Sequence, residues 1–270
     1  MLTPQIREEE NGAQTPAPEK GIKKLLSPVR RAVEDYAMIE DGDRIAVGIS
    51  GGKDSLALLL ALTAMRSFYP KRYEVVGVTV DMGFSGTDFS AIRRFCEECG
   101  AKYRVVPTEI AKIIFDVRKE SNPCSLCAKM RRGALHAEAQ RLGCNKVALG
   151  HHCDDVVDTF MLNLFYEGRL GCFSPVTYLS ERKLTLIRPL LYCEEREIVY
   201  FANKLRLPVM KSPCPEDHNT ERENMKNLLR QLERGNRGLR KRIFHAICKG
   251  EIDGFRTVDR FAYLKKKPDA

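Results

Sequence analysis

Several features that are absent from this sequence narrow the classes of protein to which it can belong. No apolar run approaches the roughly 20 residues that a membrane-spanning helix needs. Residues 1–20 are polar and rich in Pro and Glu, and they lack the hydrophobic segment of a secretory signal. No internal repeat is present. We therefore expect a soluble, cytoplasmic protein without a membrane partner, in which residues 1–20 form a disordered leader.

The composition indicates a globular domain with an anionic partner. The 270 residues and 43% hydrophobic content suffice for one large α/β domain, or for one domain with a helical appendage. The formal net charge of +9 favours a polyanionic partner. Ten cysteines without a secretion signal indicate a reducing compartment, where cysteine clusters bind metals or act in catalysis more often than they form disulfides.

The most informative stretch is a buried apolar strand, residues 45–49, that runs into a polar turn and then into an apolar helix. The turn reads Ser50-Gly51-Gly52-Lys53-Asp54-Ser55. Paired glycines let the backbone approach a ligand closely, and the N-terminus of the following helix attracts anions. The ordinary P-loop is excluded, because it would need glycine at Val47 and a hydroxyl at Asp54. An acidic residue after the lysine suits a pyrophosphate held with magnesium. The alternative is a glycine-rich turn that binds nothing.

Strands and helices alternate after this turn. A β-branched run at 73–80 predicts a second buried strand that ends at Asp81, and further strands are predicted at 103–106 and 146–149. Helical spacing predicts the helices between and around them, at residues 21–40, 88–99, 110–117, 124–142, 156–166 and 194–204. This alternation implies a doubly wound, mainly parallel sheet. Ligands of such sheets bind beyond the carboxyl ends of the strands, so we expect Asp81 to lie near a nucleotide whose pyrophosphate the turn holds.

The remaining segments complete the predicted domain plan. Residues 173–191 predict a hairpin or extended excursion, and residues 208–210 predict a short strand. Residues 219–249 read as helical and are dense in Arg and Lys. We expect an α/β domain over 21–215, a basic helical region over 216–250 and a frayed tail over 251–270.

A second polar turn follows the strand predicted at 146–149 and opens another helix. It reads Gly150-His151-His152-Cys153-Asp154-Asp155. We expect Asp155 to help hold magnesium or to position a nucleophile, and His151 to contact phosphate. The alternative is that Asp154 or Asp155 only caps the helix.

Cys124 and Cys127 open a predicted helix directly after Pro123. The helix N-terminus and the neighbouring cations would favour thiolates at these positions; the cations are Lys129, Arg131 and Arg132. Two thiolates do not complete a metal shell, and Cys214, between two prolines, is the best third ligand. Three thiolates suit an iron–sulfur cluster with one iron left open. Zinc remains an alternative if His218 or Asp217 supplies a fourth ligand, and inert buried thiols are another.

The other cysteines carry weaker signals. Cys96 and Cys99 form a competing Cys-x-x-Cys pair, but no proline flanks them and we interpret them as ordinary core and surface residues. Cys153 lies inside the second turn without an assigned role. The rest read as structural: Cys144, Cys172, Cys193 and Cys248.

A basic stretch runs along the C-terminal helices in steps of three or four residues, comprising Arg222, Lys226, Arg230, Arg234, Arg237, Arg240, Lys241 and Arg242. Such a stripe suits an RNA backbone. We expect RNA contacts from Arg237, Arg240 and Lys241, and from Arg131 and Arg132 beside the cysteines. Aromatic residues are sparse there, so base stacking is not indicated. The alternative is a solvated surface.

Together these motifs resemble the PP-loop ATP pyrophosphatase superfamily and, more closely, the tRNA 2-thiocytidine synthetase family. The matching segments are the turn at 50–55, Cys124-Ser125-Leu126-Cys127 with Arg131-Arg132-Gly133, Gly150-His151-His152 with Asp154-Asp155, Asn163-Leu164-Phe165, Arg188-Pro189-Leu190 and Pro213-Cys214. The resemblance covers about residues 26–232 and implies an adenine-nucleotide α-hydrolase-like architecture. The chain departs from the pattern after Cys214, where Pro-Glu-Asp-His replaces an expected Cys-x-x-Cys-Gly-like continuation.

The resemblance implies an ATP-dependent tRNA sulfurtransferase. Such an enzyme adenylates the C2 oxygen of a cytidine, at position 32 of the anticodon loop, and replaces that oxygen with sulfur delivered through a [4Fe–4S] cluster. AMP and pyrophosphate are released. The implied cofactors are ATP, Mg²⁺ and the cluster. The implied partners are tRNA and a sulfur donor, such as a cysteine desulfurase or sulfide, with a homodimer as one option.

The resemblance also assigns roles to individual residues. Cys124, Cys127 and Cys214 would ligate the cluster. The ATP-binding set would be Ser50, Gly51, Gly52, Lys53, Asp54, Ser55, Asp81, Gly150 and His151. Lys53, Asp54 and Asp155 would form the catalytic set, in which Lys53 stabilises the departing pyrophosphate and Asp54 or Asp155 holds magnesium. Two rivals stay open: a lysidine-synthase-like ligase that uses the same ATP site, and an RNA-binding protein with structural zinc.

Overall fold

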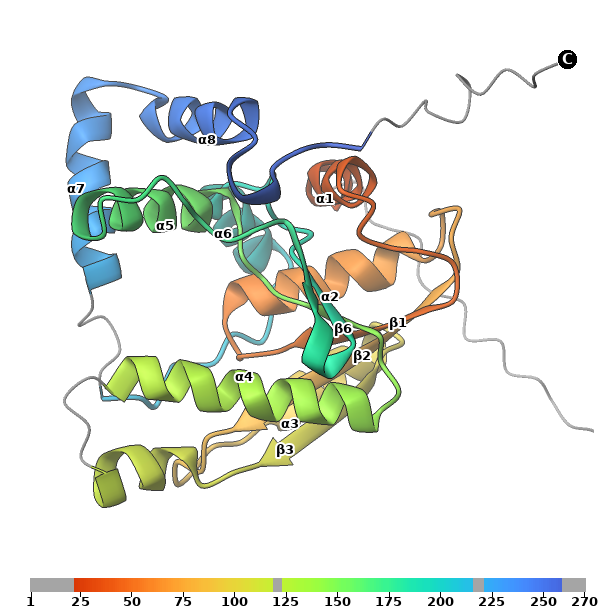
Figure 1. Cartoon of the computed structure of the whole chain (residues 1–270). Helices are drawn as coiled ribbons and strands as arrows, with labels where there is room; N and C mark the ends of the chain where they lie inside the picture. The colour runs from red at the N-terminus through yellow and green to blue at the C-terminus, as the bar shows by residue number, and fades with distance from the viewer. Residues whose placement is uncertain (1–21, 119–122, 216–220, 259–270) are drawn as a thin grey trace, which may run out of the picture.

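A computed structural model describes residues 22–118, 123–215 and 221–258 (Figure 1). Its centre is a six-stranded sheet in the order β3-β2-β1-β4-β6-β5. The strands are β1 (Asp43–Gly48), β2 (Tyr73–Asp81), β3 (Lys102–Pro107), β4 (Lys146–Ala148), β5 (Val176–Leu179) and β6 (Leu184–Ile187). The neighbours from β3 to β6 pair in parallel, and β5 pairs antiparallel with β6 at the edge. The predicted doubly wound, mainly parallel fold is confirmed.

Helices cover both faces of this sheet. They are α1 (Lys23–Asp35), α2 (Lys53–Met65), α3 (Ser90–Glu98), η1 (Lys112–Arg118), α4 (Pro123–Arg141), α5 (Cys153–Tyr166), η2 (Ser180–Arg182), α6 (Glu195–Lys204), α7 (Glu221–Gly235), α8 (Leu239–Lys249) and η3 (Ile252–Gly254). Alternation along β1 sends successive side chains to opposite faces. Ile45 and Val47 join the larger core under α1, α2 and α6, whereas Ala46 joins the smaller core under α4.

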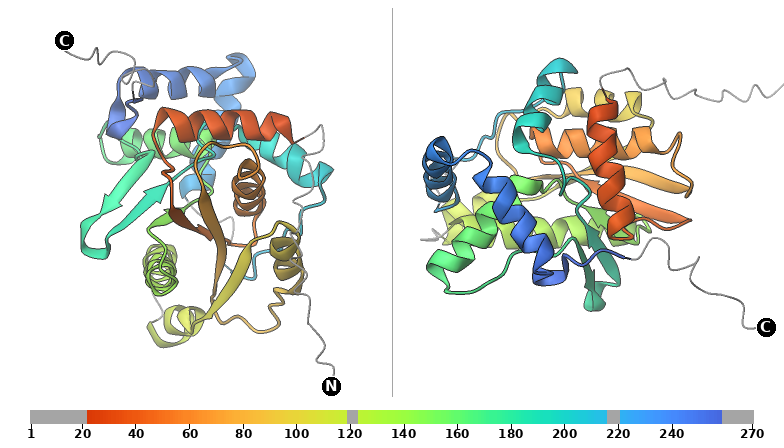
Figure 2. Two further views of the ribbon diagram at one scale, coloured as in Figure 1. Left: turned by 90° about the vertical axis from the view of Figure 1, so that its right-hand side faces the viewer. Right: turned by 90° about the horizontal axis from the view of Figure 1, so that it is seen from above.

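The central helix α2 is buried on nearly all sides. Its apolar run, Leu56 to Leu62, lies between the sheet and the outer helix α1, which crosses it (Figure 2). A helix that is apolar all round requires such enclosure. The polar turn that precedes α2 is thereby fixed at the carboxyl edge of the sheet. No helix in the three described ranges is long and apolar enough to cross a membrane.

The structure corrects four details of the predicted plan. Residues 208–210 form no strand. The predicted basic helix breaks into α7 and α8 at Gly238, whose φ of +78° favours glycine. η1 winds as a wider π-helix. The start of the predicted tail is packed, because Phe255 is buried against Tyr36 and Phe244. The predicted leader and the end of the tail lie outside the described residues.

Candidate nucleotide and cysteine site

The turn between β1 and α2 is closed by its own side chains. Gly51 has a φ of +85°, a conformation that glycine adopts without strain. The Ser50 backbone N–H donates to Ser55 Oγ over 3.2 Å, and Ser55 Oγ donates to the Gly52 carbonyl over 2.9 Å. Lys53 is the first residue of α2, so the turn presents the N-terminus of a buried helix. This geometry fits the predicted anion site.

Lys53 and Asp54 project from this turn into a cluster of charges. Lys53 Nζ lies 3.1 Å from Asp54 Oδ2 and 3.1 Å from Glu195 Oε1, at the start of α6. Burial alone would lower the pKa of Lys53, but the negative charges of Asp54 and Glu195 outweigh it and raise the pKa. The other oxygen, Asp54 Oδ1, is buried without a hydrogen-bond partner among the described residues. A carboxyl oxygen of this kind suits a hard cation.

The second turn meets the first. A Cβ atom at Gly150 would lie 3.1 Å from both the Asp54 carbonyl carbon and the Ser55 nitrogen, so a larger residue would push the two backbones apart by a few tenths of an ångström. Because β1 and β4 are neighbours, their two polar turns adjoin at one edge. The predicted juxtaposition of the two turns is therefore confirmed.

The helix after the second turn is capped by His152. The His152 N–H donates to Asp155 Oδ2 over 3.0 Å, and the Asp155 N–H donates to His152 Nδ1 over 3.4 Å, forming a capping box. Asp155 thus caps the helix as part of this box, and its other oxygen faces Arg222 of α7 at 3.4 Å. Burial alone would raise the pKa of Asp155, but its contacts with His152 outweigh this and lower it.

His151 faces a different environment. Its ring lies 4.8 Å from the ring of Phe173, and the Arg188 guanidinium stacks on the same phenylalanine at 5.0 Å. Its Nδ1 is buried, and no described residue bonds to it. Burial lowers the pKa of His151 to about 4, so the ring is neutral near pH 7. A contact to phosphate would come from a neutral imidazole.

Asp81 ends β2, beside β1, at the same edge of the sheet. Its side chain accepts a 2.9 Å hydrogen bond from the Gly83 N–H, and its carbonyl oxygen accepts from the hydroxyl of Thr108. The side chain shapes the turn after β2 and is half-buried there.

Cys124 and Cys214 both lie near Cys127. Cys124 and Cys127 lie in the first turn of α4, and Cys214 follows a segment whose Met210 N–H donates to the Gly51 carbonyl over 2.9 Å. The pKa of Cys127 is raised by burial and by the negative charges of Cys214 and Cys124, which outweigh Arg131. Cys124 and Cys214 therefore lie close enough to Cys127 to influence its pKa.

One prediction about the cysteine site is wrong, and another falls on residues that the structure does not describe. The predicted thiolate-favouring surroundings do not hold for Cys127, because burial and two like charges dominate its pKa. Within the described ranges, no three His, Cys, Asp or Glu side chains form a group that could hold a single metal ion. A four-iron cluster is larger than an ion, so its ligands stand further apart. The alternative zinc ligands, His218 and Asp217, lie outside the described residues.

The competing cysteine pair belongs to the core. Cys96 is fully buried and Cys99 half-buried, and burial raises their pKa values to about 12 and about 11. Cys153 is buried as well, and burial raises its pKa, so it is a poor nucleophile. These three thiols have the properties of structural residues.

The predicted basic stripe divides into two groups. Arg237 and Lys241 are exposed at a cleft of ≈ 1210 Å³ between α6, α7 and α8, where Lys241 Nζ also lies 2.7 Å from Glu194 Oε1. Arg240 is only 13% exposed and holds Asp158 at 2.8 Å and Asp154 at 3.4 Å, so its predicted RNA contact does not fit. Arg222 and Lys226 point to acidic residues of the nucleotide site. Arg131 and Arg132 are exposed on α4.

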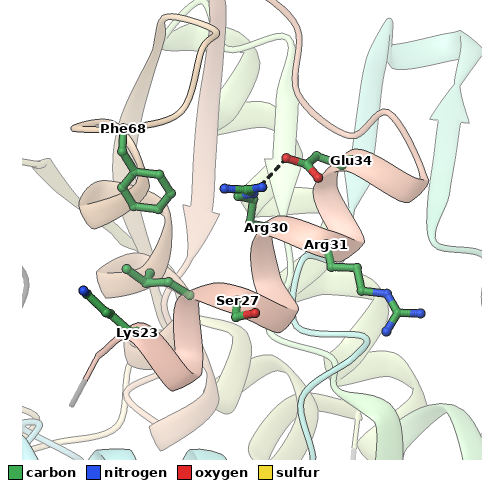
Figure 3. Close-up of a pocket in the computed structure, with 7 residues that line it drawn as sticks. Lys23, Ser27, Arg30, Arg31, Glu34 and Phe68 are labelled. Carbon is green, nitrogen blue, oxygen red and sulfur yellow. Dashed lines mark ion pairs between the residues drawn. The ribbon is translucent and has the colours of Figure 1, made fainter. Parts of the chain in front are cut away.

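A second cleft, of ≈ 660 Å³, lies on the outside of α1. Figure 3 shows Lys23, Arg30 and Phe68 around it, with Arg30 paired to Glu34 at 2.9 Å. None of its lining residues belongs to the two polar turns or to the cysteine group. This cleft is separate from the nucleotide site.

Sequence reasoning missed Glu195, and it placed Arg222 and Lys226 only in a basic stripe that suits an RNA backbone or a solvated surface. The available signal was positional, because α6 begins after β6 and its N-terminus therefore lies at the same edge as those of α2 and α5. The segment from β6 to α6 is a third strand–turn–helix unit, and its charged residue Glu195 lies where the first two units place theirs.

Comparisons with known proteins agree with this geometry. A parallel sheet whose first strand enters a Ser-Gly-Gly-Lys-Asp-Ser turn at a helix N-terminus defines a PP-loop protein, and residues 19–251 match the PP-loop domain family. The tRNA-cytidine(32) 2-sulfurtransferase of Geobacter sulfurreducens is 43% identical over 228 residues, which are 83% of this chain and 89% of the relative. Its namesake in Geobacter metallireducens is 42% identical over 233 residues, 85% of this chain and 91% of the relative.

A solved structure shares the fold. The U34-tRNA thiolase NcsA from Methanococcus maripaludis, with its [4Fe–4S] cluster, matches with a TM-score of 0.69 at 28% identity, covering 84% of this chain and 77% of that one. The chain belongs to the PP-loop domain family and, within it, to the tRNA-cytidine(32) 2-sulfurtransferases. The family predicted from the motifs is confirmed.

Proposed function

We propose that this protein is an ATP-dependent tRNA thiolation enzyme that converts cytidine 32 of the anticodon loop to 2-thiocytidine. The observation that carries the proposal is the Met210–Gly51 hydrogen bond, which joins the segment that carries Cys214 to the PP-loop turn; the influence of Cys124 and Cys214 on the pKa of Cys127 supports it. The names of the relatives support tRNA cytidine as the substrate.

The reaction begins at the turn. The residues of 50–55, with Gly150, His151 and Asp81 at the same edge, surround the ATP. The cytidine O2 attacks the α-phosphorus, the α–β P–O bond breaks, and its electron pair leaves with pyrophosphate. Lys53 stabilises that charge. Asp54 Oδ1, buried and without a hydrogen-bond partner among the described residues, fits a Mg²⁺ ligand, and Asp155 lies on the neighbouring turn.

The second half of the reaction takes place beside the cysteines. Sulfur at the sulfide level attacks C2, and AMP leaves with the former O2 oxygen, so ATP, cytidine and sulfide give 2-thiocytidine, AMP and pyrophosphate. Cys124, Cys127 and Cys214 would hold a [4Fe–4S] cluster, which leaves one iron without a protein ligand where sulfur can bind. The raised pKa of Cys127 means that loading such a site releases a proton.

The tRNA would contact the exposed cations on both sides of this site. Arg131 and Arg132 lie beside the cysteines on α4, and Arg237 and Lys241 line the cleft between α6, α7 and α8. Phosphate contacts of this kind position a nucleic acid without reading its sequence. We also propose a cysteine desulfurase or sulfide as the sulfur source, and a homodimer as the assembly.

The test is mass spectrometry of tRNA nucleosides from cells that lack the gene and carry either the wild-type protein or Asp54→Ala. We expect 2-thiocytidine only with the wild-type protein, because Asp54→Ala should stop AMP formation. Unchanged 2-thiocytidine without the gene would refute the substrate. Iron, sulfide and zinc analysis of anaerobically purified protein separates the rivals: zinc alone favours the RNA-binding protein, and no metal favours the ligase.

A further inference from the structure

Glu195 lies between two lysines from distant parts of the chain. Its Oε1 is 3.1 Å from Lys53 Nζ and 3.8 Å from Lys226 Nζ, which α7 contributes. The lysine side chains are only 26% and 17% exposed, so both are held within the site. Two ammonium groups within 4 Å of one carboxylate oxygen make a place that a polyanion can occupy.

We propose that Lys226 is a second pyrophosphate-binding lysine, and that Glu195 is the counter-ion that holds both lysines until the β- and γ-phosphates of ATP displace it. This inference rests on the proposed ATP chemistry of the same site and deepens it. Its ligand class is a magnesium-bound polyphosphate. Its new element is a role for α7 in the nucleotide site.

The local charges favour this assignment. The other basic residues that reach the site from α7 and α8 have carboxylates of their own, since Arg222 pairs with Asp155, and Arg240 with Asp154 and Asp158. When Asp54 serves magnesium, Glu195 is the carboxylate that Lys53 and Lys226 share, and Asp158 also lies near Lys226. One carboxylate oxygen thus lies within 4 Å of two ammonium groups, and an anion that carries several negative charges can replace it at both.

The chemistry of the reaction gives these cations a function. When the cytidine oxygen bonds to the α-phosphorus, the electron pair of the α–β P–O bond moves onto the departing pyrophosphate. Fixed cations around that group stabilise the transition state more than the ground state, because the charge grows as the bond breaks. Lys53 approaches from the first turn of α2, and Lys226 would approach from α7.

A purely structural role for Lys226 is poorly supported, because α7 already has an apolar anchor. Met225 and Leu229 are buried against Val157 of α5. α7 is thus attached without the ion pair. Lys226 is free to exchange Glu195 for another anion without releasing the helix.

The test compares Lys226→Met, Glu195→Gln and the control Lys204→Met, which changes an exposed lysine at the other end of α6. Calorimetry measures the Kd of inorganic pyrophosphate with Mg²⁺ and of AMP, and thermal unfolding gives Tm. We expect Lys226→Met to raise the pyrophosphate Kd about tenfold or more. The Kd of AMP should stay unchanged, because AMP lacks the β- and γ-phosphates that displace Glu195. Glu195→Gln should lower the pyrophosphate Kd. Lys204→Met should change neither.

The opposite signs separate this role from a structural one, in which both variants would lower Tm and weaken pyrophosphate and AMP alike. An unchanged pyrophosphate Kd in Lys226→Met would overturn the assignment of Lys226. Weaker pyrophosphate binding in Glu195→Gln at unchanged Tm would overturn the counter-ion role. Wild-type protein that binds neither ATP nor pyrophosphate would overturn the proposed function together with this inference.

Discussion

The Met210 N–H donates a 2.9 Å hydrogen bond to the carbonyl oxygen of Gly51. Gly51 belongs to the turn that would bind ATP, and Met210 lies four residues before Cys214. The Met210 side chain also lies against Gly51, where an added Cβ atom would be 3.3 Å from Met210 Cβ. The segment that carries the third cysteine is therefore attached to the nucleotide turn itself. A base activated at this turn would remain close to the cysteines.

Replacing Cys214 with Ala should abolish thiolation and leave ATP binding measurable, because the cysteine lies beyond the turn that holds the nucleotide. The measurements are 2-thiocytidine by mass spectrometry and ATP affinity by calorimetry. The matched control is Cys99→Ala, a half-buried thiol packed away from the site, which should keep full thiolation. Thiolation retained in Cys214→Ala would disprove its role as a ligand.

Gly150→Ala should damage the nucleotide site without touching a catalytic side chain. The new Cβ would lie 3.1 Å from the Asp54 carbonyl carbon, so the two turns must separate. We expect a loss of about 1–3 kcal/mol in the free energy of unfolding and weaker ATP binding. Urea unfolding and calorimetry measure these two effects.

Gly133→Ala is the control for that substitution. Gly133 lies inside α4 with open space around it, so alanine should stabilise the protein by about 0.5–1 kcal/mol. Equal effects at positions 133 and 150 would mean that the contact between the two turns is unimportant.

The sequence predicted the parts of this molecule that depend on local order. Each strand–turn–helix unit has its own periodicity and turn chemistry, so the sheet, the two polar turns and the cysteine-bearing helix were predictable. The pairing of Lys226 with Glu195 was not, because no local pattern specifies a contact between α7 and α6. Residues 208–210 were misread for a related reason. Their backbone joins the Gly51 turn and pairs with no strand.

Arg240 and Arg237 should respond to substitution in different ways. Arg240→Met would leave the fully buried Asp158 without its 2.8 Å partner, and we expect a cost of about 3–5 kcal/mol in unfolding free energy. Adding Asp158→Asn to the Arg240→Met variant should recover part of the lost unfolding free energy. Exposed Arg237→Ala should leave stability unchanged, weaken tRNA binding and reduce the slope of log affinity against log salt by about one.

Urea unfolding and tRNA binding at several salt concentrations distinguish these two roles. Loss of tRNA affinity in Arg240→Met at unchanged stability would restore the predicted RNA contact for this residue. Salt dependence that Arg237→Ala leaves unchanged would remove Arg237 from the tRNA surface.

Stability should fall in mild acid because of His151. Burial lowers the pKa of His151 in the folded protein to about 4, from an ordinary value of 6.5. Between these two pH values, His151 is protonated in the unfolded chain and neutral in the folded chain. The contribution of His151 is therefore complete above pH 6.5 and is lost as the pH falls towards 4. The charged or titratable groups that face it are Asp155, Arg188, Arg222 and His152.

The lowered pKa corresponds to a loss of about 1–3 kcal/mol across this range, since His151 is half-buried and water moderates the effect of burial. His151→Gln should flatten the decline in unfolding free energy between pH 6.5 and 4, and urea titrations at several pH values measure it. The control His245→Gln alters an exposed histidine of α8 and should keep the wild-type slope. An unchanged slope in His151→Gln would show that His151 titrates alike in the folded and unfolded chains and does not cause the decline.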